Sequence, residues 1–218
     1  METLVVLGSF GRDKKSYYRL FETTPKHWKV YALSYNDVVP HGKTEKISEN
    51  ILQFLKNHDI SSCTVVGHSL GGTFALKFAS THPQKVKRLV LIDSLGVKKH
   101  QNMISLFINE IRVQIGNILI SRNLKTIYNI EWITTWDVLN NPIMYLRLAQ
   151  YVAKINLEKA ASEINTPTLL IWGKDDYLTP LSDGKKLYQL MRNSKLVVFD
   201  GLNHEWILHW PEKLWELL

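Results

Sequence analysis

Short apolar runs alternate with amphipathic stretches along most of this chain. The apolar runs have the length and β-branched content of buried strands, and glycine, proline or polar residues bound them. They predict strands at Thr3–Leu7, Lys29–Leu33, Thr64–Gly67, Arg88–Ile92, Thr168–Trp172 and Lys195–Phe199. Helical spacing of apolar residues predicts helices at Glu45–Asn57, Gly71–Thr81 and Leu181–Met191, and from about His204 to the end. This alternation is typical of βαβ units, so we expect an α/β fold with a mainly parallel six-stranded sheet and flanking helices.

The segment 96–163 differs from the rest of the chain. It is rich in Ile, Leu, Asn and aromatic residues, carries three or four helical patterns and shows no clear strand. Because it lies between two predicted strands of one sheet, we expect an inserted helical cap rather than a separate domain. The core domain would then be formed by residues 1–95 and 164–218.

The strongest chemical signal is Gly67-His68-Ser69-Leu70-Gly71, which lies between a predicted strand and a predicted helix. In a Gly-x-Ser-x-Gly pattern the glycines leave room for a sharp, strained turn that raises the serine hydroxyl above the sheet edge. The helix N-terminus favours negative charge that develops beside the hydroxyl. Since the required strand and helix flank the pattern, it predicts Ser69 as a nucleophile.

A serine hydroxyl needs a histidine base and an acid that orients the histidine. Two acids, Asp175 and Asp176, follow the strand predicted at Thr168–Trp172, and His204 follows the strand predicted at Lys195–Phe199. An acid just past one strand end can reach a histidine past another across the top of the sheet. The sequence therefore supplies all three groups of a catalytic triad.

Together these motifs resemble the α/β-hydrolase superfamily, specifically its capped esterase, lactonase and C–C hydrolase branch. The resemblance runs from Leu4-Val5-Val6-Leu7-Gly8 to Asn203-His204 and Trp210-Pro211-Glu212. In similar proteins the acid is the fourth residue of Gly-x-x-Asp, which implies Asp176, and the base follows the last strand, which implies His204. The order serine, aspartate, histidine is also that of the superfamily. Larger relatives carry two strands before the first one here, which implies a minimal sheet.

The resemblance further implies an oxyanion hole made by backbone N–H groups of Leu70 and of the loop after the first strand. Similar proteins usually carry His-Gly in that loop, whereas this chain has Gly8-Ser9-Phe10-Gly11. The hole needs backbone N–H groups rather than the histidine side chain. We therefore expect Phe10 to donate alongside Leu70, with Ser9 as the alternative donor.

Other titratable residues compete for these roles. Asp93 ends a predicted strand near the same edge, where some similar proteins place their acid, although Asp176 fits its motif better. The side chain of His68 is expected to point away from the site and pack, and His209 to have a surface or packing role. We expect no metal site, because no paired ligands stand at metal spacing around His27, His41 and His58. We also expect no cofactor, because acyl transfer by such a triad requires none.

Aromatic residues of the expected cap are candidates for substrate binding. Trp132, Trp136 and Tyr145, with Tyr128 and Met144, are placed to line an apolar acyl pocket above the serine. Each of them also suits the cap's own core, so the sequence leaves both roles open.

Composition restricts the class of partner. The formal net charge is +7, but the basic residues are scattered and lack the stripe with interleaved aromatic residues that is typical of nucleic-acid sites. We expect a solvated basic surface and no nucleic-acid partner. The sequence shows no export leader and no apolar stretch of roughly 18 residues, so no membrane span is expected. With Cys63 as the single cysteine, this favours a cytoplasmic monomer or homodimer.

These observations predict a serine hydrolase that cleaves carboxylic esters or lactones of small, largely apolar substrates through an acyl-enzyme. A C–C bond hydrolase, a thioesterase, an amidase and a cofactor-free perhydrolase use the same triad and remain alternatives. A ligand receptor with slow turnover is the alternative from another class. Serine at the elbow argues against haloalkane dehalogenation, because similar dehalogenases carry a carboxylate there.

Overall fold

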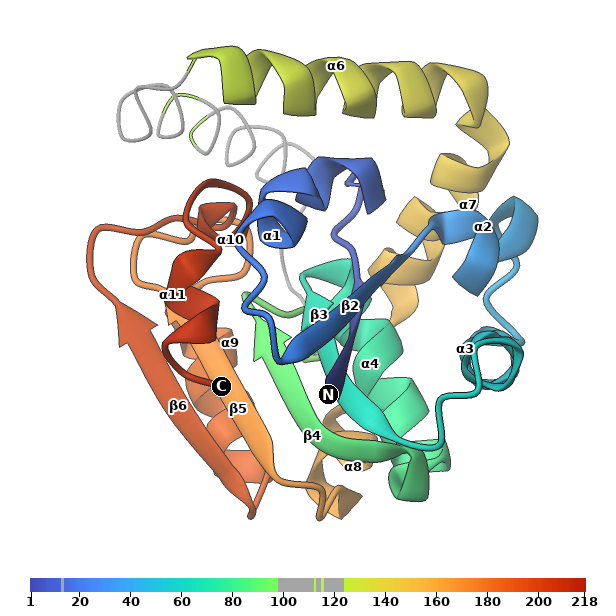
Figure 1. Ribbon diagram of the computed structural model, residues 1–218, viewed down its shortest axis with the longest axis vertical. Coiled ribbons are helices and arrows are strands. Elements are labelled where there is room, and N and C mark those ends of the chain that lie inside the picture. The colour runs from blue at the N-terminus through green and yellow to red at the C-terminus, as the bar shows by residue number, and fades with distance from the viewer. Residues whose placement is uncertain (13, 98–111, 113–114, 116–123) are drawn as a thin grey trace.

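The fold is built on one six-stranded sheet in which every strand pair is parallel, in the order β2-β1-β3-β4-β5-β6 (Figure 1). The computed structural model describes residues 1–12, 14–97, 112, 115 and 124–218. The strands are β1 (Glu2–Leu7), β2 (Trp28–Leu33), β3 (Cys63–His68), β4 (Val86–Ile92), β5 (Thr168–Gly173) and β6 (Ser194–Phe199). The fold class expected from the sequence is thereby confirmed.

The central strands are continuous apolar runs because helices cover both faces of the sheet. In β1, Val5 and Leu7 belong to one hydrophobic core, whereas Leu4 and Val6 belong to a second core on the opposite face. This alternation follows from the two-residue period of a strand. Every residue of β3 is buried, which places its carboxyl end in the middle of the packed molecule.

Two layers of helices complete these cores. The first core includes side chains of α3 (Ile47–Asn57), α4 (Leu70–Thr81), α8 (Glu158–Glu163) and α9 (Leu181–Leu190). The second includes side chains of α1 (Tyr18–Glu22), α10 (Trp206–His209) and α11 (Glu212–Trp215). The short helix α2 (Tyr35–Val38) and the 3-10 turns η1 (Lys14–Tyr17), η2 (Pro40–Gly42) and η3 (Pro83–Lys85) connect these elements.

Between β4 and β5 the chain inserts α6 (Leu124–Asn140), α7 (Pro142–Lys154) and α8. Helix α6 lies across the top of the view in Figure 1, above the carboxyl ends of the strands, and contacts η1. Helix α7 buries Met144, Tyr145 and Leu148 in the first core, and α8 packs against α4 and α9. The expected helical insertion is present, and its boundaries at 96 and 163 stay a prediction.

One expected element differs. The helix expected from His204 to the end is divided into two single turns, α10 and α11. Trp210 between them has φ −133° and ψ 58°, because a residue before proline is disfavoured in the helical region and Pro211 follows. In the described part of the chain, no helix is both long and apolar enough to cross a membrane.

Candidate active site

Ser69 occupies a sharp turn between β3 and α4. Its φ of 52° lies in the left-handed region, where a residue with a side chain is strained. A Cβ atom on Gly67 would lie 2.5 Å from the Cα of Gly72, and a Cβ atom on Gly71 would overlap the Leu7 carbonyl. Both glycines of the sequence pattern are therefore required by close packing at this turn.

Neighbouring strand ends hold the backbone of Ser69. The Ser69 N–H donates to the carbonyl of Ile92 at 2.9 Å, and the Leu95 N–H donates to the Ser69 carbonyl at 3.0 Å. The residue is 5% exposed and directly precedes α4. The hydroxyl is thus carried at the N-terminus of a buried helix, where developing negative charge is favoured.

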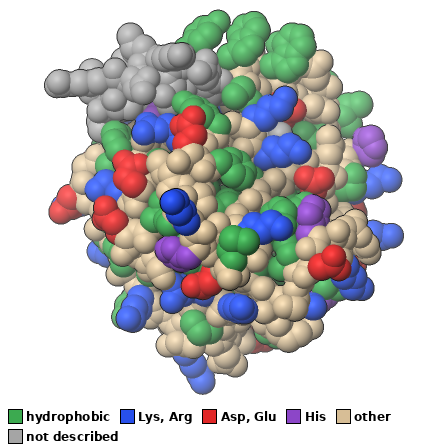
Figure 2. All heavy atoms as spheres, viewed as in Figure 1, with side chains coloured by type: hydrophobic (Ala, Val, Ile, Leu, Met, Phe, Trp, Pro, Cys, Tyr) green, Lys and Arg blue, Asp and Glu red, His purple; other side chains and the backbone are tan. Residues whose placement is uncertain are grey.

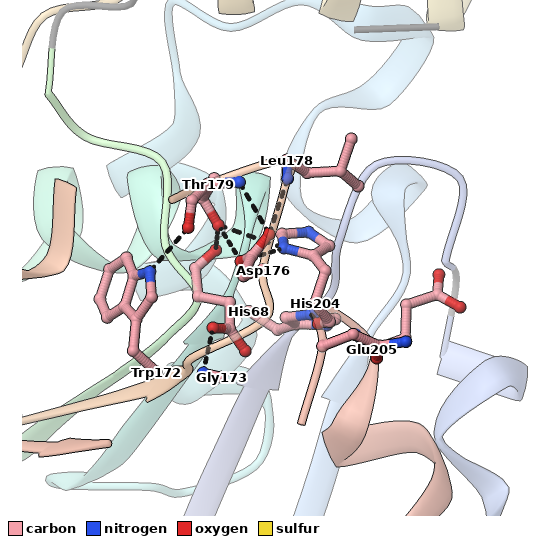
Figure 3. Close-up of polar contacts among 10 residues, drawn as sticks. His68, Trp172, Gly173, Asp176, Leu178, Thr179, His204 and Glu205 are labelled. Carbon is pink, nitrogen blue, oxygen red and sulfur yellow. Dashed lines mark hydrogen bonds and ion pairs between the residues drawn. The ribbon is translucent and has the colours of Figure 1, made fainter. Parts of the chain in front are cut away.

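Asp176 and His204 meet at the same edge of the sheet. The Nδ1 atom of His204 lies 2.7 Å from Oδ2 of Asp176, and both residues are 3% exposed (Figure 3). The N–H groups of Leu178 and Thr179 donate to Oδ1 of Asp176 at 2.8 and 2.9 Å. Thr179 Oγ1 lies 2.5 Å from Oδ2. This loop after β5 therefore holds the carboxylate in one orientation.

Electrostatics favour the charged form of Asp176. Burial by itself raises the pKa of this carboxyl, but the neighbouring His204 charge and the hydrogen bonds from His204 and Thr179 outweigh burial and lower the pKa. A charged carboxylate at Nδ1 fixes the tautomer of His204, so that Nε2 is the atom able to accept a proton.

Two of the three predicted triad residues are joined directly. In the described part of the chain, no hydrogen bond links Ser69 Oγ to His204. His68, which precedes Ser69, contacts the His204 backbone through Nε2 at 2.8 Å, so the serine and histidine segments are adjacent. Catalytic hydrogen bonds of this kind commonly tighten only in the substrate complex.

Asp93, the competing acid, is differently placed. Its Oδ1 atom accepts from the Gly173 N–H at 2.8 Å, and among the described residues no hydrogen bond joins its side chain to His204. Asp93 is fully buried, and burial together with the neighbouring Asp176 charge raises its pKa well above the usual value. The surroundings thus favour the protonated form of Asp93 and the charged form of Asp176.

The loop after β1 distinguishes the two expected oxyanion donors. The Ser9 N–H donates to the Tyr17 hydroxyl at 2.9 Å and is therefore already occupied. Among the described residues, the N–H groups of Phe10 and Leu70 have no acceptor. Leu70 is the first residue of α4, where helix geometry leaves the N–H without an intrahelical partner. The geometry thus leaves the Phe10 and Leu70 amides able to bind an oxyanion.

His68 packs as expected but also supports the site. Its Nε2 atom donates to the His204 carbonyl, so Nδ1 must accept, and the Tyr17 hydroxyl donates to it at 2.8 Å. Burial, followed by the His204 charge, lowers the pKa of His68 to about 3 and keeps the ring neutral. A buried chain of hydrogen bonds therefore runs from Ser9 through Tyr17 and His68 to His204, and the sequence carries no local signal for it.

The three aromatic residues expected at the substrate lie in different environments. Trp132 and Trp136 on α6 are 57% and 62% exposed, and their rings stack with centroids 6.4 Å apart. Hydrophobic side chains gather at the top of the face in Figure 2. Tyr145 on α7 is buried, with its ring 5.3 Å from that of Phe10. The structure thus brings Tyr145, and not the two tryptophans, against Phe10 of the loop after β1, and the binding role of all three stays a prediction.

Within the described residues, no group of three or more His, Cys, Asp and Glu side chains could hold a metal ion. The parallel sheet, the serine turn between strand and helix, and the acid and histidine that follow later strands define the class of the α/β-hydrolases. Residues 44–209 match the family described as serine aminopeptidase, S33, and the chain belongs to this family of hydrolases.

Similar proteins act on different substrates. The 2-hydroxy-6-oxononadienedioate/2-hydroxy-6-oxononatrienedioate hydrolase 1 of Pseudomonas putida is 29% identical over 190 residues, which are 78% of this chain and 66% of that protein. A bromoperoxidase from Bacillus anthracis has a similar structure, with a TM-score of 0.81 at 17% identity, over 99% of this chain and 90% of that one. The esterase EaEST from Exiguobacterium antarcticum has a TM-score of 0.80 at 16% identity, over 100% of this chain and 90% of that one. The chain thus spans just under two thirds of the Pseudomonas relative.

Proposed function

We propose that this hydrolase is a serine esterase or lactonase with Ser69 as nucleophile, His204 as base and Asp176 as the acid that orients the base. Its substrates are small, largely apolar carboxylic esters or lactones. The observation that carries this proposal is the hydrogen-bonded pair of Asp176 and His204 at the sheet edge where Ser69 occupies its strained turn.

The placement of these groups supports the following reaction. The Nε2 atom of His204 takes the hydroxyl proton of Ser69 while Oγ bonds to the substrate carbonyl carbon. The N–H groups of Leu70 and Phe10 stabilise the resulting oxyanion, each by about 3 kcal/mol in comparable sites. When the tetrahedral intermediate collapses, the ester C–O bond breaks and His204 returns the proton to the leaving alkoxide. In a lactone this alkoxide stays part of the acyl chain.

Water completes the cycle by the same steps. His204 takes a proton from water, the hydroxide attacks the acyl carbon, and the carboxylic acid leaves as the Ser69 hydroxyl is restored. Asp176 stays charged throughout and stabilises the imidazolium that forms twice in each turnover. This role agrees with the lowered pKa of its carboxyl.

A second candidate substrate comes from one relative. The Pseudomonas putida protein is named for 2-hydroxy-6-oxo diacids, and at 29% identity it favours the cleavage of such an acid as the second function. The same nucleophile and base would serve, so substrate preference distinguishes the two candidates.

The test is a panel of p-nitrophenyl esters, lactones, thioesters, amides and a 2-hydroxy-6-oxo diacid at matched concentrations. We expect the short esters or lactones to be turned over fastest, and Ser69→Ala to lower kcat by roughly 10⁴-fold or more. Ser94→Ala is the matched control, because this nearby buried hydroxyl donates only to the Leu95 carbonyl in the described structure.

A covalent probe separates a wrong nucleophile from a wrong substrate. A fluorophosphonate should label the native chain at Ser69 and should fail to label Ser69→Ala. Labelling without turnover of any ester or lactone would leave the nucleophile in place and reject the substrate class. An unchanged rate in Ser69→Ala would reject the nucleophile itself.

A further inference from the structure

A buried arginine lies outside the proposed triad, at a place where three distant segments meet. Arg12 follows the oxyanion loop and is 3% exposed. Its Nε and Nη2 atoms lie 2.7 and 2.5 Å from Oε1 of Glu205, the residue after His204. Its Nη1 atom donates to the hydroxyl of Thr134 on α6. One guanidinium thus connects the loop after β1, which carries Arg12, to the loop that holds His204 and to the inserted helix α6.

The loop that carries Arg12 is held in a single shape. The Arg12 N–H donates to the Ser9 carbonyl at 2.9 Å, and Gly11 between them has φ +74°. A Cβ atom on Gly11 would lie 3.0 Å from the Cγ2 methyl of Thr134. Thr134 therefore contacts this turn twice, through its methyl at Gly11 and through its hydroxyl at Arg12. Phe10, a proposed oxyanion donor, lies within the same turn.

The partner of Arg12 is equally constrained. Glu205 is 4% exposed, and its side chain points away from Asp176 in Figure 3. Burial alone raises the pKa of Glu205, but the Arg12 charge and its hydrogen bond outweigh burial and lower the pKa, so the pair is charged on both sides. Separating the two charges of a buried ion pair would leave each of them uncompensated in the interior. The pair therefore strongly favours the arrangement in which the two groups touch.

We propose that Arg12 is a positioning residue that fixes the Phe10 amide relative to His204, and that its contact with Thr134 makes the position of α6 part of that arrangement. This inference rests on the proposed function, in which Phe10 and His204 act on the same carbonyl group. It gives the inserted helix a direct influence on the rate of the chemical step, in addition to any contact with substrate.

The first test separates positioning from stability. Arg12→Met alone should lower both the melting temperature and kcat, because it removes the guanidinium that pairs with the buried Glu205 carboxylate. Arg12→Met with Glu205→Leu removes both charges of this ion pair, so the melting temperature should return to within about 3 °C of the native value. The contacts of Arg12 with Glu205 and Thr134 are still absent, so kcat should stay about 10- to 100-fold below the native value, with a smaller change in KM. Recovery of kcat together with the melting temperature would overturn the proposal.

The second test addresses the inserted helix. Thr134→Val keeps the methyl group at Gly11 and removes the hydroxyl that accepts from Arg12. We expect a threefold to tenfold lower kcat with little change in melting temperature. Thr135→Val is the matched control, because Thr135 is the exposed neighbour on the same helix and should keep native kcat. Equal kcat values for the two variants would show that the contact of α6 with Arg12 does not affect the chemical step.

Hydrogen exchange keeps this inference testable if the proposed reaction is wrong. In Arg12→Met with Glu205→Leu, peptides covering residues 8–12, 203–207 and 132–136 should all exchange faster than in the native chain. Faster exchange in a chain that hydrolyses none of the panel would reject the proposed function and retain the coupling. Unchanged exchange in the three segments would overturn the coupling whatever the activity.

Discussion

The side chains at the carboxyl edge of the sheet and those on the inserted helix α6 differ in burial and in how many partners hold them. At the edge, Asp176 is 3% exposed, and backbone N–H groups, a threonine hydroxyl and His204 surround its carboxylate. On α6, Trp132 and Trp136 are 57% and 62% exposed and stack on each other. A buried, fully bonded polar group has one stable arrangement, whereas an exposed ring is weakly constrained. The polar groups at the sheet edge are therefore held in one arrangement, whereas the two tryptophans of α6 are not.

The largest difference should appear between the two carboxyl groups of the edge. Asp176→Asn should lower kcat about 10⁴-fold, because an amide cannot fix the histidine tautomer or stabilise the imidazolium. Asp93→Asn should keep kcat within about tenfold, because an amide resembles the protonated acid, the form that the raised pKa of Asp93 favours. Steady-state kinetics on the best ester of the panel measure both values.

Stability gives an independent check on Asp93. A carboxyl whose pKa is raised by folding binds a proton more tightly in the folded chain, so the native protein loses stability as pH rises above the usual value of 3.8. Asp93→Asn removes this loss, and its unfolding free energy should improve relative to the native chain between pH 4 and 7. A larger loss of kcat in Asp93→Asn than in Asp176→Asn would exchange the two roles.

The edge was predictable because its signals are local. Strand positions follow from continuous apolar runs such as Val65-Val66, and the serine turn follows from glycines that the packing at Leu7 and Gly72 requires. Each expected strand agrees with the observed one to within two residues at either end. The Gly-x-x-Asp motif selects Asp176 over Asp175, and the structure joins Asp176 to His204.

The contacts of the site with distant segments were not predictable. Arg12 and Glu205 are 193 residues apart in the sequence, and neither lies in a pattern that indicates a buried ion pair. The same holds for the contact of Tyr17 with His68, because it depends on how α1 and η1 pack above the sheet. The apolar residues of α6 are not gathered on one face of the helix, so their spacing does not indicate which face lies inward. The exposure of Trp132 could therefore not be read from the sequence.

An intermediate effect should appear in acid. The pKa of His68 is lowered to about 3, whereas an unfolded histidine titrates near 6.5, so the unfolded chain binds a proton in this window that the folded chain does not. Stability should fall as pH decreases from 6.5 toward 3, by up to about 1.4 kcal/mol per pH unit from this group. The lowered pKa values of Asp176 and Glu205 add losses in the same direction at lower pH.

Urea unfolding at several pH values measures this slope. His68→Gln removes the titrating ring, so its unfolding free energy should depend less steeply on pH between 6.5 and 4.5 than that of the native chain. His27→Gln, at an exposed position, should keep the native slope. Identical slopes for all three proteins would show that His68 is not buried in its neutral form.

The smallest effect should come from the exposed side of α6. Trp136→Ser should change the unfolding free energy by about 0.5 kcal/mol or less, because the ring is 62% exposed. Its KM for short p-nitrophenyl esters should stay within about twofold of the native value. Tyr145→Ala is the comparison on α7: the ring packs against Phe10 and Tyr35, so its removal should affect both stability and KM. A KM that rises with acyl length in Trp136→Ser would instead place this ring at the substrate, one of the two roles that the sequence leaves open, and would require α6 to turn this ring inward when substrate binds.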